Sequence, residues 1–123
     1  MVGALLDTNI LIDYLNGVPQ AREEISRYQN PAISIITWME VMVGAKADRV
    51  DPTRRFLEGF DLLALDNKIA SAAVALRRAH RIKLPDAVIW ASAQTTGRIL
   101  VTRSTKDFPT SDPGIREPYI LYM

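Results

Sequence analysis

Hydrophobic residues along this chain fall into short continuous runs separated by longer stretches with helical spacing. The short runs do not alternate with polar residues, which is typical of parallel strands buried on both faces. They predict four strands, and a less regular fifth near the C-terminal end, at residues 4–6, 32–36, 62–65, 98–102 and 119–122.

The longer stretches between these runs fit helices. In the segment 67–81, Ile69, Ala73 and Leu76 recur at helical intervals, so this helix should cover one face of a sheet. The predicted helices lie at residues 8–15, 19–29, 37–46, 52–59, 67–81 and 86–96. Strands that alternate with helices predict an α/β fold with a parallel sheet and helices on both sides.

Length and composition limit the number of domains and the classes of chemistry that the chain can carry. A chain of 123 residues is expected to form a single domain spanning residues 1–123. The net charge of +1 does not favour any class of partner, because nucleic-acid binding requires only a local basic patch. The chain has no cysteine and one histidine, His80, which excludes thiolate chemistry and argues against a histidine-based zinc site.

The N-terminal region lacks the features of a secretion signal. "MVGALLDTN" contains no basic region followed by a long apolar stretch, so we expect no signal peptide. Every apolar run is shorter than the roughly 20 residues that a membrane-spanning helix requires. We therefore expect no membrane partner, and a cytoplasmic location is compatible with the sequence.

Four carboxylates stand where a predicted strand ends or a predicted helix begins. Each has a simple explanation as a helix cap or as a favourable charge at the positive end of a helix. Asp7 fits an N-cap, Thr37-x-x-Glu40 a capping box, and Ser104-x-x-Asp107 a looser version of one. We refer to the four as the acidic cluster: Asp7, Glu40, Asp86 and Asp107.

Taken together, the four acids indicate more than capping. Parallel strands end at the same edge of a sheet, so acids that follow several strands should crowd there and repel one another. A cation would neutralise such a cluster, and an all-oxygen ligand set suits Mg²⁺ or Mn²⁺. Such an ion often acts on phosphates, and the chain has no "GxxxxGK[ST]" loop of an NTPase. A phosphodiester hydrolase fits these residues best.

Four segments of the chain match successive motifs of a known family. They are "LLDTNILIDYL", "IITWMEVMVGA", "KLPDAVIWASAQTTG" and "ILVTRSTKDF", and they extend from the first predicted strand to Phe108. Their order and separation resemble those of PIN-domain ribonucleases, specifically the VapC toxins of toxin–antitoxin modules.

This resemblance implies a three-layer α/β/α sandwich and a Mg²⁺- or Mn²⁺-dependent endoribonuclease. Asp7 and Asp86 would hold the metal most directly, and Glu40 and Asp107 would complete the cluster through water or a second metal. A metal-activated water would attack in line and leave a 5′-phosphate and a 3′-hydroxyl. The family further implies a homodimer that a cognate VapB-type antitoxin inhibits.

Side chains beside the acids correspond to positions that support the metal ligands in this family. Thr8 and Asn9 follow Asp7, and Thr102 and Ser104 precede Asp107, so these four should orient carboxylates or metal-bound water. Relatives often carry Asn where this chain has Ser104, and a hydroxyl offers fewer hydrogen bonds than an amide.

Basic residues near the acidic cluster are candidates for contacts with RNA. Arg103 and Lys106 flank Asp107 and could bind substrate phosphates. The run "RRAHRIK" at residues 77–83 has two readings that the sequence leaves open. It could be a phosphate track, or a solvated helix end whose cations suit the helix dipole.

Two other classes of function remain as alternatives. A phosphoryl-relay receiver is also a parallel α/β domain, but it needs an acidic pair after its first strand, where this chain has Asp7-Thr8-Asn9. It also needs a phospho-accepting Asp after its third strand, where Asp66 more simply caps a helix. A catalytically inactive RNA- or protein-binding domain of the same fold is the second alternative, and the presence of all four acids argues against it.

Overall fold

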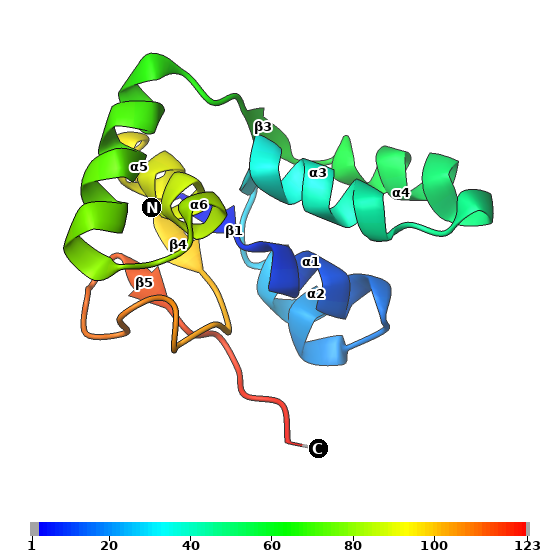
Figure 1. The fold of residues 1–123 in the computed structure, drawn as a ribbon. Helices are drawn as coiled ribbons and strands as arrows, with labels where there is room; N and C mark the ends of the chain where they lie inside the picture. Colours follow the sequence, from blue (N-terminus) through cyan, green and yellow to red (C-terminus); the bar gives the residue numbers. More distant parts are fainter. Residues whose placement is uncertain (1–2, 123) are drawn as a thin grey trace.

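A five-stranded, fully parallel sheet runs through the centre of the protein. The computed structural model describes residues 3–122. The strand order is β3-β2-β1-β4-β5, so the first strand lies in the middle of the sheet (Figure 1). The strands are β1 (Ala4–Leu6), β2 (Ala32–Ser34), β3 (Asp61–Leu63), β4 (Ile99–Val101) and β5 (Ile115–Arg116).

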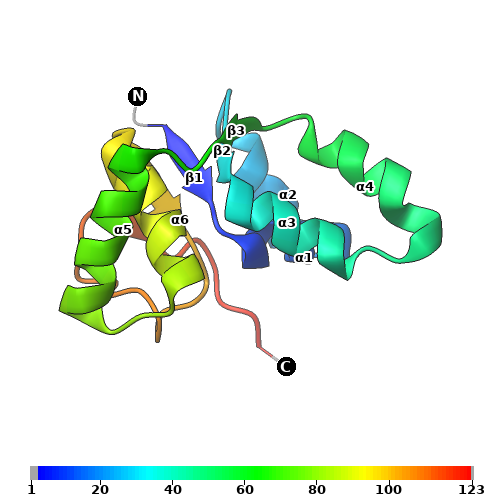
Figure 2. The same cartoon turned by 45° about the horizontal axis from the view of Figure 1, so that its top comes forward.

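Helices cover both faces of this sheet. In two views, α5 and α6 lie on one side and α1 to α4 on the other (Figures 1 and 2). The helices are α1 (Thr8–Leu15), α2 (Pro19–Ser26), α3 (Ile35–Gly44), α4 (Val50–Leu57), α5 (Asn67–His80) and α6 (Leu84–Thr95), with a short 3₁₀ turn η1 (Ala47–Arg49). No helix within residues 3–122 combines the length and the hydrophobicity needed to cross a membrane.

The alternation of side chains along each strand divides the core in two. Leu5 and Leu100 pack with α5 and α6, whereas Leu6 and Val101 pack on the opposite face with residues of α1, α3 and α4. Both faces are buried, which explains why the strands appear in the sequence as continuous apolar runs. The predicted α/β/α sandwich with a central parallel sheet is confirmed.

The second strand is shorter than the sequence pattern predicts. The Ser34 hydroxyl accepts a hydrogen bond from the Ile36 amide at 3.0 Å, so Ser34 is the N-cap of α3. Ile35 and Ile36 therefore begin the helix instead of extending the strand. The predicted Thr37-x-x-Glu40 capping box is wrong, because Thr37 and Glu40 both lie inside α3.

The C-terminal region also departs from the prediction. Residues 119–122 do not form a strand, and the fifth strand is instead Ile115–Arg116, which pairs with β4. Pro118 lacks an N–H to continue the pairing, and the Tyr119 hydroxyl bonds to the Asp13 carboxylate at 2.8 Å. Two paired residues leave too short a pattern to detect in a sequence.

The remaining differences concern the ends of other elements. The strand predicted at 62–65 lies at Asp61–Leu63, and the one predicted at 98–102 at Ile99–Val101. The helix predicted at 37–46 lies at Ile35–Gly44, and the one predicted at 67–81 ends at His80. The helix predicted at 19–29 ends at Ser26, the one predicted at 52–59 begins at Val50, and the one predicted at 86–96 begins at Leu84. Ser104 and Asp107 lie in turns between β4 and β5 and not at the start of a helix, so the looser capping box predicted there is also wrong.

Candidate metal site at the carboxyl edge of the sheet

Asp7 lies directly after β1, at the point where the chain turns into α1. Its Oδ1 accepts the Thr8 amide at 2.8 Å, so Asp7 is the N-cap that the sequence predicts. Its Oδ2 accepts the Thr102 hydroxyl at 2.7 Å and the Asn9 side-chain amide at 3.2 Å. Thr102 follows β4, whose preceding connection covers the opposite face from α1. Such a switch point at the carboxyl ends of strands is where parallel sheets usually bind ligands.

The environment of Asp7 disfavours its charged form. The residue is 5% exposed. Burial raises its pKa to about 6, which hydrogen bonds from Thr102 and the Thr8 amide partly oppose. The negative charges of Asp86 and Glu40 make smaller contributions to this raised pKa. A carboxylate held in a fixed orientation, with a raised pKa and like charges nearby, is typical of a site that functions with a cation.

Asp86 belongs to the helical layer on the opposite face of the sheet from α1. It lies in the first turn of α6, after Pro85, and is partly buried. Burial raises its pKa, and the charges of Asp107 and Glu40 raise it further, while Lys83 lowers it. Because Asp86 is also among the charges acting on Asp7, all four predicted acids belong to one electrostatic group.

Thr8 links Asp7 to Glu40. Its hydroxyl donates to Glu40 Oε1 at 2.5 Å, and its oxygen lies 3.0 Å from that of the Thr37 hydroxyl. Glu40 is exposed, whereas Thr37 is buried behind it on the same helix. Sequence reasoning missed this role of Thr37. The available signal was its spacing of three residues from Glu40, which places both on one face of a helix.

The loop after β4 supplies Asp107 and its neighbours. The Ser104 hydroxyl donates to Asp107 Oδ2 at 2.5 Å, and the Ser104 amide donates to the Thr102 hydroxyl at 2.9 Å. Each predicted supporting residue is therefore within hydrogen-bonding distance of a carboxylate of the acidic cluster. They are Thr8, Asn9, Thr102 and Ser104.

Arg103 forms an ion pair within the protein, and its predicted contact with substrate stays a prediction. Its guanidinium binds the Asp13 carboxylate in a bidentate pair, at 2.5 and 2.9 Å, and the same carboxylate accepts the Tyr119 hydroxyl. The Arg103 amide also donates to Asn9 Oδ1 at 3.2 Å. Asp13 was missed as a supporting residue, and the signal was a carboxylate within the otherwise apolar segment "ILIDYL". Lys106, the other predicted substrate contact, is exposed.

The chemistry of the cluster suits a hard cation. Its members offer only carboxylate oxygens, flanked by hydroxyls and an amide, and their mutual repulsion would be relieved by a divalent ion. Within residues 3–122, no three His, Asp or Glu side chains are already converged as a metal cage. The assignment of particular ligands therefore stays a prediction.

Fold and site together define a three-layer α/β/α domain with an acidic site at the switch point of its parallel sheet. The PIN domain family matches residues 4–109. The chain therefore belongs to the PIN-domain family.

Solved structures support this assignment and confirm the predicted resemblance to VapC toxins. A toxin–antitoxin complex from Klebsiella pneumoniae contains a chain with 46% identity and a TM-score of 0.91, covering 96% of this chain and 99% of that one. A DNA-bound VapBC complex from Salmonella typhimurium gives 26% identity and a TM-score of 0.76, with 94% and 96% covered. VapBC2 from Rickettsia felis shares the fold, with a TM-score of 0.71 and 22% identity. The match covers 93% of this chain and 96% of that one. No curated protein matches the chain.

The receiver alternative does not fit the structure. The Asp66 carboxylate, which would have to accept a phosphoryl group, instead accepts the Ile69 amide at 2.8 Å as the N-cap of α5. The strand order also differs from the 2-1-3-4-5 order of flavodoxin-like domains such as receivers.

Proposed function

We propose that this protein is the toxin of a toxin–antitoxin module and acts as a metal-dependent endoribonuclease. Asp7 carries the proposal. A nearly fully buried carboxylate with a raised pKa, held by three hydrogen bonds and repelled by two further carboxylates, is costly for the fold alone. A bound cation would offset that cost and make the buried carboxylate a metal ligand.

The proposed ligands are those at the centre of the cluster. Asp7 and Asp86 would hold Mg²⁺ or Mn²⁺, and Glu40 and Asp107 would complete the site directly or through water. When bound, the ion would bind a phosphate oxygen, lower the pKa of a water molecule and offset charge on the leaving oxygen.

The protein's own residues fix the geometry of this chemistry. Thr102, Asn9 and the Thr8 amide set the orientation of Asp7, and the Thr8 hydroxyl holds one oxygen of Glu40. In the reaction, water oxygen bonds to phosphorus and the bond from phosphorus to the 3′ oxygen breaks. One proton of the water ends on that 3′ oxygen, which leaves a 5′-phosphate and a 3′-hydroxyl.

The proposed partners follow from the related complexes. The Klebsiella pneumoniae structure is a toxin–antitoxin complex, and the Salmonella typhimurium and Rickettsia felis structures are VapBC complexes bound to DNA. We therefore propose a VapB-type antitoxin as the cognate partner and RNA as the substrate. A homodimer and a cytoplasmic location are proposed from the resemblance to VapC toxins.

A cleavage assay tests the proposal. Purified protein is incubated with total RNA in Mg²⁺, in Mn²⁺ and in EDTA, alongside Asp7→Asn and Asp86→Asn variants. We expect cleavage by the wild type in either metal and none in EDTA. Both variants should lose activity, and Glu23→Gln, which removes an exposed carboxylate on α2, should keep it.

Two outcomes would contradict the proposal. Equal cleavage by the wild type and both variants would indicate a contaminating nuclease and overturn the site. A wild type that binds RNA but does not cleave it in either metal would favour the catalytically inactive RNA-binding domain.

A further inference from the structure

The turn between α5 and α6 and the loop at residues 105–109 enclose a groove of about 460 Å³. Four basic side chains line it, two at the end of α5, one at the start of α6 and one from the loop. We call it the basic groove and define it by these four: His80, Arg81, Lys83 and Lys106. Its positive charges come from segments far apart in the sequence.

The floor of the basic groove is apolar and firmly packed. Ile82 and Phe108 are both buried, and Phe108 packs edge-on against Trp90 with ring centroids 6.0 Å apart. The His80 ring lies 4.8 Å from that of Trp90, and Arg77 Nη1 donates to the Ile82 carbonyl at 2.8 Å. The groove is therefore shaped by the packing of Phe108 and His80 on Trp90 and by the Arg77 hydrogen bond.

The four basic side chains are exposed and lack anionic partners. None of them forms an ion pair with an acidic residue of the described chain, residues 3–122. The dipole of α5 favours basic side chains at its C-terminal end, which accounts for His80 and Arg81. It does not explain Lys106 in a loop, and Lys83 is the N-cap of α6, where the dipole disfavours a cation.

Arg81 adopts a backbone conformation that its side chain disfavours. Its φ is 57°, in the left-handed region, where the end of a helix usually carries glycine or asparagine. Arginine in this position gives the fold a strained residue and the groove a positive charge. Strain of this kind persists mainly where a function uses it.

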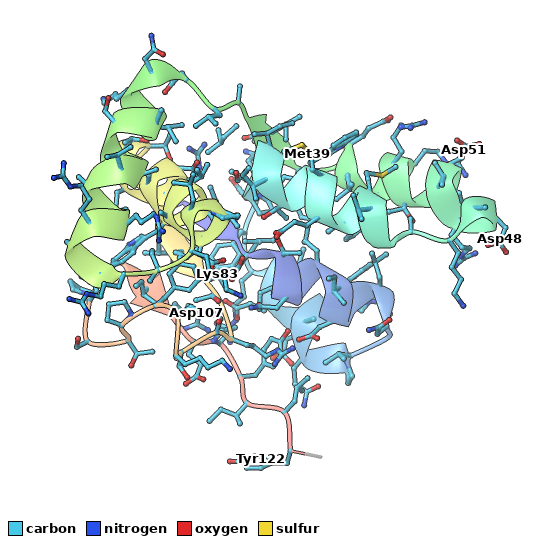
Figure 3. The ribbon with its side chains drawn as sticks, in the orientation of Figure 1. Met39, Asp48, Asp51, Lys83, Asp107 and Tyr122 are labelled. Carbon is cyan, nitrogen blue, oxygen red and sulfur yellow. The ribbon has the colours of Figure 1, made fainter. Side chains whose placement is uncertain are left out.

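The basic groove adjoins the acidic cluster. Asp107 lines the groove and also acts on Asp86, and Lys83 lowers the pKa of Asp86. Figure 3 shows Lys83 and Asp107 near each other, whereas Asp48 of η1 and Asp51 of α4 lie far from them at one end of the molecule. An anion in the groove would thus lie next to the proposed site of cleavage.

We propose that the basic groove binds the phosphate backbone of single-stranded RNA beside the scissile phosphate. This inference rests on the proposed ribonuclease function. The groove has the volume of a small-ligand pocket, which is enough for a segment of a single strand. Contacts to phosphates from these cations would hold the strand without reading its bases.

The test compares two double variants that remove equal charge. Lys83→Ala/Lys106→Ala removes one positive charge from each side of the groove. Lys46→Ala/Lys68→Ala removes two exposed lysines elsewhere. Binding of a fluorescein-labelled single-stranded oligouridylate is followed by anisotropy over a salt series in EDTA, so that cleavage does not interfere. The salt slope should fall by about 1.4 in the first variant, from about 0.7 per phosphate contact, and should stay unchanged in the second.

Arg81→Gly distinguishes an effect of the Arg81 charge on RNA binding from an effect on folding. Glycine adopts the left-handed conformation without strain, so we expect the Tm to stay equal or rise while affinity for the oligouridylate falls. An affinity equal to that of the wild type would show that the Arg81 charge does not contact the strand and would overturn its place in the proposal.

The results distinguish this inference from the proposed function. Equal salt slopes for the two double variants, or no salt-dependent binding by the wild type, would overturn the groove while metal-dependent cleavage could still stand. A reduced slope for Lys83→Ala/Lys106→Ala alone, with no cleavage by the wild type in Mg²⁺ or Mn²⁺, would support the groove and contradict the ribonuclease.

Discussion

At the scale of single residues, Asp7 meets two demands that conflict. As an N-cap it contributes roughly 1 kcal/mol to α1 through its hydrogen bond to the Thr8 amide. As a buried carboxylate it opposes folding once it ionises. Burial raises its pKa from 3.8 to about 6, which corresponds to about 3 kcal/mol of lost stability at pH well above 6.

The sign of this effect gives a test in EDTA. Because the folded protein favours the protonated acid, Asp7 stabilises the fold most below pH 3.8, and that contribution is lost as pH rises through about 6. Asp7→Asn should therefore raise the free energy of unfolding at pH 8 by up to about 3 kcal/mol and by much less at pH 4. Added Mg²⁺ should stabilise the wild type and not the variant. A variant less stable than the wild type at pH 8 would contradict this account.

Thr102 offers a second prediction at the same scale. Its buried hydroxyl donates to Asp7 Oδ2 and lowers the pKa of that acid. Thr102→Val keeps the shape of the side chain and removes the donor, so Asp7 should hold a proton more readily and compete less well for a cation. We expect the Mg²⁺ concentration for half-maximal RNA cleavage to rise about 10-fold, whereas Thr102→Ser should stay near the wild type. Equal shifts in both variants would contradict a role for the hydroxyl.

At the scale of elements, one ion pair joins α1 to the loop after β4. Arg103 and Asp13 form it, with side chains 30% and 8% exposed, and the Arg103 amide binds the Asn9 side chain that in turn contacts Asp7. The pair therefore sets the position of two segments that supply the acidic cluster. This structural role differs from the substrate contact that the sequence predicts for Arg103.

Arg103→Ala distinguishes the two roles. Removing the guanidinium leaves the buried Asp13 carboxylate with only the Tyr119 hydroxyl, so we expect a loss of about 3 kcal/mol in the free energy of unfolding. Arg103→Met combined with Asp13→Leu should recover much of that loss. Chemical denaturation measures both, and Lys106→Ala is the matched control with little expected effect. Unchanged stability of Arg103→Ala, with a raised KM for RNA, would instead support the substrate contact.

How far the elements could be predicted depends on what fixes their ends. The apolar runs and the helical spacing locate four strands and six helices, although many ends differ by a few residues, because burial on both faces leaves a clear pattern. The end of β2 was misplaced because Ser34 caps α3 through one side-chain hydrogen bond, and Ile35 and Ile36 suit a strand as well as a helix. Strand β5 was missed because two residues carry no periodicity.

The residues of the candidate site also differ in how far the sequence predicts them. The sequence predicts that Asp7, Glu40 and Asp107 lie at one edge of the sheet, since the parallel strands that they follow end there. Asp86 follows α5, so its place beside them depends on where α6 begins. The contacts of Thr37 and Asp13 could not be predicted, because each depends on a partner that only the tertiary structure brings close. Thr37 lies 3.0 Å from the Thr8 hydroxyl across 29 residues of chain, and Asp13 meets Arg103 across 90.

At the scale of the whole molecule, the last strand is tied to the second helix by another buried acid. Glu24 of α2 accepts two hydrogen bonds from Arg116 of β5, at 2.8 and 3.0 Å, and one from the Tyr28 hydroxyl at 2.7 Å. Arg27 lies 3.1 Å away on the same helix. This contact joins a helical layer to the edge of the sheet just before the C-terminal segment that carries Tyr119.

The charge of Glu24 makes this tether depend on pH. Burial alone would raise the pKa of Glu24, but the hydrogen bonds from Arg116 and Tyr28 and the charges of Arg116 and Arg27 outweigh it and hold the pKa below 4.5. The contribution to stability is therefore present above pH 4.5 and is lost as pH falls through the lowered pKa of the folded protein.

Glu24→Gln tests whether the contribution of Glu24 to stability depends on pH. At pH 7 the amide loses the charged hydrogen bonds and places a donor against Arg116 or Tyr28, so we expect a loss of about 2 kcal/mol in the free energy of unfolding. The difference from the wild type should shrink as pH falls below 4.5, because protonation removes the same interactions from the wild type. Urea denaturation at several pH values measures this, with Glu23→Gln, at an exposed position, as control. A difference that stays constant down to pH 3 would mean that Glu24 stabilises the tether by packing and not by charge.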